Sequence, residues 1–276
     1  MGEKAGLAPD LIYQALKSGA GGSKMYEVRG VMMAKVEPTL IPLVGRLMTE
    51  YNYDRFHPSN YDYGRFDGPQ SGTDMFEFEL HTLDGKSVYL GDYQDKWLVL
   101  ETGSLTCPMY VKNINPIKSV MKKYPDVEFL VVYVREAHPG SRQGAHATLA
   151  QKLSVARKSQ NVYDEIRPVV VDDLDGSMHR AYGSFPNMVY VINPDGVVVY
   201  RCDWAFPYLI DQVLSDRPKL HLAERKRIVT AAPWVMVPVT LNGGWDALWD
   251  LLIALPGILW GHVKADFLNN FTERQS

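Results

Sequence analysis

One segment, residues 97–124 (WLVLETGSLTCPMYVKNINPIKSVMKKY), constrains the fold more than any other because it joins a buried strand directly to a helix. Residues 97–101 form a short apolar run of the kind found in fully buried strands, and Gly103 then breaks the run. A helical pattern starts at Pro108, and proline suits the first helical position because its missing N–H would have no intrahelical partner there. Cys107 is therefore expected at the N-cap of this helix.

A cysteine at the start of a helix has the chemistry of a nucleophile. The positive end of the helix dipole points at the Cys107 sulfur and favours the thiolate. Free cysteine has a pKa of about 8.5, and a site of this kind lowers it by about one to several units. We therefore predict a reactive thiol with a lowered pKa, in preference to a cysteine that is buried for structural reasons alone.

Composition limits the class of protein. With 276 residues, of which 46% are hydrophobic and 22% charged, the chain can bury one sizeable core with large appendages or two small domains. The net charge of -3 provides no basic field, so nucleic acid is not an expected partner. The two cysteines, Cys107 and Cys202, are too distant for a CxxC pair and too few for a disulfide scaffold or a tetrahedral zinc site. Because the first residues also have no apolar core of signal-peptide length, we expect a cytoplasmic protein without a metal site.

The remaining elements predict one mixed α/β sheet. Residues 75–80 and 87–90 alternate polar and apolar side chains around a turn and are expected to form a hairpin. Further strands are expected at residues 127–134, 168–171, 188–192 and 197–201, and further helices at residues 147–159, 177–182 and 208–214. This order, with a reactive cysteine after the central strand, is that of a thioredoxin fold with an added N-terminal hairpin. We expect an N-terminal extension (1–70), a thioredoxin-like catalytic domain (71–218) and a C-terminal apolar helical extension (219–276).

Both extensions contain apolar segments. In the N-terminal extension, residues 11–16 and 39–51 have helical spacing, with a linker at residues 19–23. Aromatic residues then recur from Tyr51 to Phe66, and we favour an irregular arm anchored across the core over a ligand-stacking surface.

In the C-terminal extension, residues 246–260 (DALWDLLIALPGILW) are strongly apolar but shorter than the roughly 20 residues that span a bilayer. A membrane-surface helix, which would make the protein membrane-associated, is one interpretation. A helix packed on the core or on a second subunit of a homodimer is the interpretation that we favour.

Five segments of the chain together resemble the iodothyronine deiodinase family over about residues 74–215. They are GSLTCP (103–108), VVYVREAHPG (131–140), HATLAQKLSVAR (146–157), VVVDDLDGSMHRAYG (169–183) and YVINPDGVVVY (190–200). The family's active-site position is commonly selenocysteine in animal enzymes, and Cys107 stands there in this chain. The resemblance implies that Cys107 is the nucleophile of a deiodinase. It also implies further site residues: Ser104, Thr106, Tyr133, Glu136, His138 and His146.

Reductive deiodination suits these residue types. A soft nucleophile takes the iodine and an acid protonates the ring, so a thiolate with nearby histidines is adequate for a small aromatic substrate. No cofactor is expected, because an external thiol reductant would regenerate the cysteine. Simpler roles stay open: His146 exposed to solvent, Glu136 paired with Arg135, Tyr133 in the core, and the two hydroxyl residues as turn or cap residues.

A thiol peroxidase or disulfide reductase is the alternative function. The peroxiredoxin pattern PxxxTxxC is not met, because Leu100 and Ser104 occupy its proline and threonine positions. Pro186, however, precedes the predicted fourth strand, where thioredoxin-like proteins generally carry a proline that faces the active cysteine. Cys202 is the sole candidate for a resolving thiol, and we favour a structural role for it. A non-catalytic binding module is a third and weaker interpretation.

Overall fold

The computed structural model describes residues 25–28, 31–34, 51–64, 66–217, 219, 221 and 229–272, with side chains from residue 51 to residue 265. The chain divides into two compact units, Met1–Thr49 and Glu50–Ser276. In the first unit, β1 (Met25–Val28) and β2 (Val31–Ala34) form an antiparallel pair that the sequence analysis did not predict. The helices predicted at residues 11–16 and 39–51 and the linker at 19–23 lie outside the described residues, apart from Tyr51. The boundaries predicted at 70/71 and 218/219 stay predictions.

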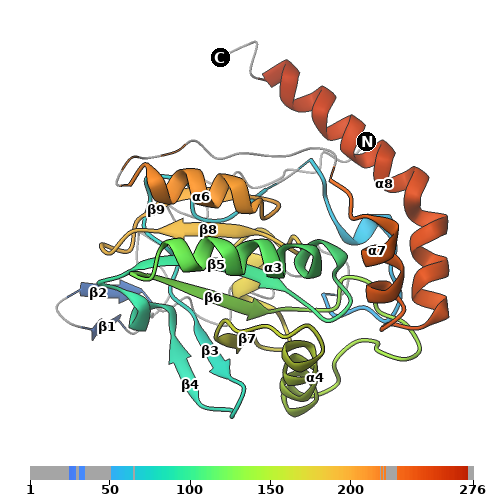
Figure 1. Cartoon of the computed structure of the whole chain (residues 1–276), viewed down its shortest axis with the longest axis horizontal. Coiled ribbons are helices and arrows are strands. Elements are labelled where there is room, and N and C mark those ends of the chain that lie inside the picture. The colour runs from blue at the N-terminus through green and yellow to red at the C-terminus, as the bar shows by residue number, and fades with distance from the viewer. Residues whose placement is uncertain are drawn as a thin grey trace, which may run out of the picture. The chain divides into compact units, whose positions relative to one another are not determined.

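A seven-stranded mixed sheet forms the centre of the second unit, in the order β4-β3-β7-β6-β5-β8-β9 (Figure 1). Strand β5 pairs in parallel with β6 on one side and antiparallel with β8 on the other, and β8 pairs antiparallel with β9. This four-stranded centre, in which β8 alone runs against the others, is the thioredoxin arrangement, so the predicted fold is confirmed. The strands are β3 (Glu79–Thr82), β4 (Ser87–Tyr89), β5 (Trp97–Gly103), β6 (Val127–Tyr133), β7 (Val169–Val171), β8 (Val189–Ile192) and β9 (Val198–Cys202).

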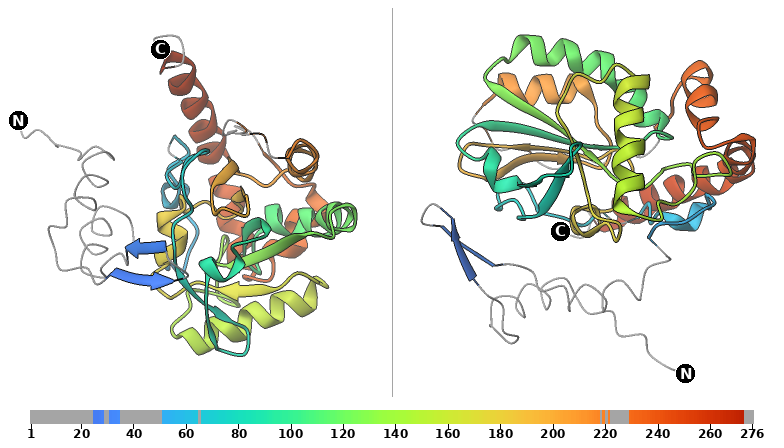
Figure 2. Two further views of the ribbon diagram at one scale, coloured as in Figure 1. Left: turned by 90° about the vertical axis from the view of Figure 1, so that its left-hand side faces the viewer. Right: turned by 90° about the horizontal axis from the view of Figure 1, so that it is seen from below.

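Helices cover both faces of this sheet, which explains why its central strands β5 and β6 are mainly apolar. On one face, Val99 of β5 packs with α3 (Pro108–Lys123) and α6 (Pro207–Ser215), which lie side by side (Figure 2). On the other face, Leu98 and Leu100 belong to a larger cluster that includes side chains of α4 and α5. These last helices span Leu149–Val162 and Ser177–Ala181. The alternation along β5 therefore sends neighbouring side chains into two separate clusters.

The hairpin at the start of the sheet is confirmed, but its first strand is displaced from the predicted residues 75–80. Strand β3 begins at Glu79 because the preceding residues pair elsewhere: the Met75 N–H donates to the Gly196 carbonyl at 2.9 Å, and Asp74 forms a bridge with Val197. The turn between β3 and β4 contains Gly85 with φ of +85°, a backbone conformation that favours glycine. A short 3₁₀ helix, η2 (Leu90–Tyr93), follows β4.

The aromatic arm, residues 51–64 and Phe66, lies across the second unit as predicted. Five of its aromatic side chains are buried: Tyr51, Tyr53, Phe56, Tyr61 and Phe66. The buried guanidinium of Arg135 lies 4.7, 4.9 and 5.0 Å from the ring centroids of Tyr51, Tyr53 and Tyr61, and it donates to the Tyr51 carbonyl at 2.8 Å. Cation–π contacts with the buried guanidinium of Arg135 therefore fix the arm to the loop that follows β6. The arm also contains η1 (Pro58–Asn60).

Two helices close the chain, α7 (Pro233–Thr240) and α8 (Trp245–Thr272), the second extending well beyond the predicted residues 246–260. Ala247, Leu251 and Ala254 of α8 are buried, so this side of the helix packs on the core as we favoured. Arg55 of the aromatic arm adds a two-bond ion pair with Asp250, at 2.6 Å for each contact. Within the described part of the chain, no helix combines the length and apolarity that crossing a membrane would require.

Candidate active site

Cys107 occupies the N-cap of α3, as predicted. Gly103 ends β5, and a Cβ at that position would lie 2.6 Å from the Tyr110 ring, so only glycine allows the strand to turn so closely into the helix. The Tyr110 N–H donates to Cys107 Sγ at 3.5 Å, which satisfies one of the free amides of the first helical turn. The thiol lies 3.7 Å from the carbonyl oxygen of Pro186, to which it can donate.

The state of this thiol differs from the prediction. Cys107 is only 1% exposed and belongs to the larger hydrophobic cluster. Burial raises the pKa of the Cys107 thiol to about 12; the amides of Tyr110 and Met109 lower it less than burial raises it, and Glu101 and Glu136 raise it further. The predicted lowered pKa is therefore wrong for this conformation. The helix dipole stabilises an anion by at most about 2 kcal/mol, which is less than the penalty for removing a thiolate from water.

Ser104 and Thr106 join the turn after β5 to the loop after β6. The Ala137 N–H donates to Ser104 Oγ at 3.2 Å, and the His138 N–H donates to Thr106 Oγ1 at 3.0 Å. Thr106 in turn donates to Glu136 Oε2 through its amide at 2.9 Å and its hydroxyl at 2.7 Å. Ser104 and Thr106 therefore connect the turn after β5 to the loop after β6 through hydrogen bonds, and they are not simple turn residues.

Glu136 is the centre of this network. Its Oε1 accepts a hydrogen bond from the Tyr133 hydroxyl and lies 3.4 Å from His146 Nε2. The Tyr133 hydroxyl also accepts from the Leu105 N–H at 3.1 Å. Burial raises the pKa of Glu136, but contacts with His146, Thr106 and Tyr133 lower it by more and hold it below its usual value. Glu136 is therefore a buried carboxylate that stays ionised, and the alternative in which it pairs with Arg135 is wrong.

The two predicted histidines both follow this carboxylate in the sequence, two and ten residues later, and both are placed in the interior. His146 is 3% exposed, so the solvent-exposed alternative is wrong. Burial lowers the pKa of His138 to about 4 despite the opposing effect of Glu136, which leaves its imidazole neutral at pH 7; its ring packs 4.7 Å from that of Phe56. Among the described residues, no group forms a hydrogen bond with Nδ1 of either histidine. Both rings thus keep a nitrogen that a ligand or a water molecule could use.

Two tyrosines near Cys107 were missed by the sequence analysis. Tyr163, at the end of α4, donates to the Leu105 carbonyl at 2.7 Å, and its pKa is raised by burial, by Glu136 and by Cys107. Tyr61 of the aromatic arm accepts from the Tyr53 hydroxyl at 2.9 Å, and its pKa is raised chiefly by burial, with a further contribution from Cys107. No local pattern marks either residue, because the chain returns to the site from distant elements.

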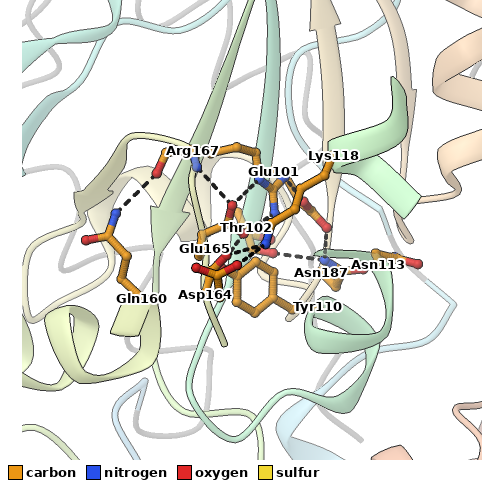
Figure 3. Close-up of polar contacts among 10 residues, drawn as sticks. All are labelled: Glu101, Thr102, Tyr110, Asn113, Lys118, Gln160, Asp164, Glu165, Arg167 and Asn187. Carbon is orange, nitrogen blue, oxygen red and sulfur yellow. Dashed lines mark hydrogen bonds and ion pairs between the residues drawn. The ribbon is translucent and has the colours of Figure 1, made fainter. Parts of the chain in front are cut away.

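A buried charge network lies behind the site and was also missed (Figure 3). Arg167 is buried between two carboxylates: it contacts Glu101 on β5 and makes two side-chain bonds to Glu165, of 2.9 and 2.6 Å. Tyr110 donates to Glu165 at 3.0 Å, and Asn187 donates to Glu101 at 2.7 Å. The only signal in the sequence was an acidic residue at the end of an apolar run. Burial raises the pKa of Glu101 despite its contacts with Arg167, and Glu101 in turn raises the pKa of the Cys107 thiol, which opposes its ionisation.

Neither a metal site nor a cysteine pair is formed by the described residues. No cluster of three or more His, Cys, Asp or Glu side chains in the described ranges could hold a metal ion. Cys107 and Cys202 lie in separate hydrophobic clusters, that of Cys202 being the one beneath α3 and α6. This placement agrees with a structural role for Cys202.

The sheet order and the position of Cys107 at the start of the helix after β5 place the chain in the class of thioredoxin-fold proteins with a cysteine at this helix N-terminus. The family model described as iodothyronine deiodinase matches residues 62–214, which is more than half of the chain. The chain therefore belongs to the iodothyronine deiodinase family, and the resemblance found in its motifs is confirmed.

Known relatives match part of the chain. Thyroxine 5-deiodinase of Ovis aries is 31% identical over 114 residues, covering 38% of this chain and 38% of the sheep protein. Thyroxine 5-deiodinase of Homo sapiens is 30% identical over 136 residues, covering 45% of this chain and 44% of the human protein. The matched region thus spans less than half the length of these relatives.

Solved structures resemble the chain more distantly. A secreted disulfide oxidoreductase of Mycobacterium tuberculosis is 15% identical with a TM-score of 0.40, over 50% of this chain and 94% of that chain. A thiol:disulfide interchange protein of Chlorobium tepidum is 17% identical with a TM-score of 0.39, over 55% of this chain and 95% of that chain. The assignment of the fold rests on the strand order described above.

Proposed function

We propose that the protein removes iodine reductively from an iodothyronine-like aromatic ring, with Cys107 as the nucleophile and an external thiol as the reductant. The observation that carries the proposal is the position of Cys107 at the start of α3, beside a loop whose Glu136 and His146 lie 3.4 Å apart. Membership of the deiodinase family and the names of the thyroxine 5-deiodinase relatives support the choice of substrate class.

The proposed reaction has two stages. The Cys107 thiolate attacks the iodine, a sulfur–iodine bond forms, and the carbon–iodine bond breaks with its electron pair left on the ring carbon. His146 donates a proton to that carbon, and the ionised Glu136 holds the imidazole in place through their 3.4 Å contact. Two external thiols then reduce the sulfenyl iodide, which gives the free cysteine, iodide, a proton and a disulfide of the reductant.

The buried thiol adds a condition to this mechanism. In the resting protein Cys107 is covered and un-ionised, so substrate must reach it through movement of a neighbouring segment. The aromatic arm is the segment that we propose to move, because Phe56 packs on His138 and Tyr61 interacts with Cys107. A closed resting state would also protect the thiol from oxidation in the absence of substrate.

One contact favours a second candidate, a disulfide reductase or thiol peroxidase. The Pro186 carbonyl, three residues before the start of β8, accepts from Cys107 Sγ at 3.7 Å, so the backbone at this proline faces the sulfur. An extended disulfide substrate could pair with the backbone at this position. Cys202 offers this candidate no resolving thiol, since it lies in the other hydrophobic cluster.

Iodide release separates the candidates. The purified protein is incubated with thyroxine and dithiothreitol, and in parallel with hydrogen peroxide and with a protein disulfide. Iodide release that is lost in Cys107→Ser and kept in Cys202→Ser supports deiodination, whereas activity on peroxide or disulfide alone selects the second candidate. Glu136→Gln should lower iodide release by about a hundredfold, because general acid catalysis contributes about 10² or more. A Glu136→Gln enzyme with unchanged kcat would exclude the role given to the Glu136–His146 pair.

A further inference from the structure

The exposed side of helices α7 and α8 is unusually apolar for a protein surface. Among the described residues, fifteen large hydrophobic side chains are exposed, and ten of them lie on these two helices. We define the tryptophan face by six of them: Trp234 on α7, and Trp245, Trp249, Ile253, Leu259 and Trp260 on α8. A contiguous apolar patch of this kind usually marks an interaction site.

Helix α8 is apolar on two opposite sides. Its inward side, with Ala247, Leu251 and Ala254, is buried against the body of the second unit. Its outward side carries the tryptophan face, in which Trp245, Trp249 and Trp260 are 72%, 63% and 69% exposed. A helix that is hydrophobic all round is normally buried on every side, so α8 needs a second apolar partner. Figure 1 shows α8 at the edge of this unit with α7 beside its N-terminal part, which leaves the outward side accessible.

The charged residues around the tryptophan face are mainly basic. Arg142 borders it through a hydrogen bond to the Leu241 carbonyl at the end of α7, and Lys264 lies on α8 itself. Arg55 lies beside it as well but is already paired with Asp250. Helix α8 contains three acids, of which Asp246 and Asp250 have described side chains and contact Ser141 and Arg55. Arg142 and Lys264 are thus the cations at the border of the apolar surface that form no ion pair with these two acids.

We propose that the tryptophan face rests on the surface of a phospholipid bilayer, with α8 parallel to the membrane plane. Tryptophan is enriched at membrane–water interfaces because its ring is apolar and its N–H is polar, and four of the six tryptophans of the chain lie on this face. Arg142 and Lys264 at the border of the face match lipid phosphates. The inward side of α8 is fixed to the protein, so only one side of the helix enters the interface.

Charge favours lipid over a second copy of the chain. In a twofold dimer the same surface meets itself, so the cations at the border of one copy would face those of the other. An antiparallel contact along α8 would bring Lys264 of one copy toward Arg142 of its partner, and a parallel contact would bring the two Lys264 side chains together. A phosphate headgroup, by contrast, would neutralise Arg142 and Lys264.

Flotation with lipid vesicles tests the proposal on the full-length protein. The wild-type chain should float with phosphatidylcholine vesicles and show a blue shift of its tryptophan fluorescence. The double variant Trp249→Gln/Trp260→Gln should partition at least about tenfold less, because binding strength scales with the apolar area that is buried. Tyr208→Gln on α6 is the matched control, since Tyr208 is 60% exposed outside the tryptophan face, and it should bind like the wild type.

Three results would overturn the proposal. The wild-type protein could fail to float with any vesicles, or the double variant could float as well as the wild type while thermal unfolding shows both to be folded. Light scattering without lipid could instead show a dimer that the double variant abolishes, which would assign the tryptophan face to a second copy. None of these measurements uses iodide release, so the outcome is independent of the proposed reaction.

Discussion

Alkylation of Cys107 should reveal how strongly the fold opposes ionisation of this thiol. Burial raises its pKa to about 12, against 9.0 for an ordinary cysteine. At about 1.36 kcal/mol per pH unit, the difference corresponds to about 4 kcal/mol against the thiolate. At about pH 8 the thiolate fraction falls from about one in ten to about one in ten thousand, which is a change of about a thousandfold.

Peptide mass spectrometry of Cys202→Ser protein treated with iodoacetamide provides the assay. The rate at Cys107 should rise about tenfold per pH unit from about pH 7 to about pH 10 without a plateau, because only the thiolate reacts. In protein unfolded with urea, the same peptide should react about a thousandfold faster at about pH 8 and level off above its ordinary pKa. The measured difference should be at least this large, since the reagent must also reach a buried sulfur.

Rapid modification that levels off at about pH 7 would refute this reasoning, because it would mean that the helix dipole outweighs burial in the resting protein.

A matched pair of variants tests the contribution of the buried charge network. Glu101→Gln removes a carboxylate that raises the pKa of Cys107, so it should move the rate profile to lower pH. Asp164→Asn removes an exposed carboxylate, with 90% side-chain exposure, and should leave the profile unchanged.

Three further predictions concern stability. The pKa of Cys107 is higher in the folded than in the unfolded protein, so the wild type should become less stable relative to Cys107→Ala as the pH rises from about 9 to about 12. The free energy of unfolding, measured with guanidinium, should fall by about 1.4 kcal/mol per pH unit relative to the variant. A difference that stays constant over this range would contradict the prediction. Arg167→Met leaves two buried carboxylates unpaired and should cost about 3–5 kcal/mol in urea unfolding, and a loss below about 1 kcal/mol would argue against the network. Gly103→Ala places a Cβ 2.6 Å from the Tyr110 ring and should lower stability by about 1–3 kcal/mol; an unchanged melting temperature would show that the ring can move.

Local sequence patterns were sufficient for the order of the elements. The apolar run of β5, the proline after Cys107 and the β-branched strand β6 are short-range signals, so they predicted the central strands, the helix and the position of the cysteine between them. Where boundaries shifted, as in β3, the cause was a competing partner: residues 74 and 75 pair with residues 196 and 197, which no local pattern specifies.

The site residues were obtained from motifs, but their states depend on the tertiary structure. The sequence supplied Ser104, Thr106, Tyr133, Glu136, His138 and His146 as candidates. Folding gathers them because the loops after β5 and β6 meet: Thr106 and Tyr133 donate to Glu136, and His146 Nε2 lies 3.4 Å from it. The sequence could not predict the pKa of Cys107. A helix N-terminus is a local feature that favours the thiolate, whereas burial depends on side chains from the aromatic arm, from α4 and from the segment before β8.

The amino-acid sequence alone thus determined the thioredoxin order, the deiodinase resemblance and the position of Cys107 at the start of a helix, since each depends on neighbours in the chain. The tertiary structure decided that the thiol is covered and un-ionised, that Glu136 stays charged beside His146, and that one side of α8 remains exposed. These properties depend on desolvation and on contacts between distant residues, and both are set only when the whole chain packs.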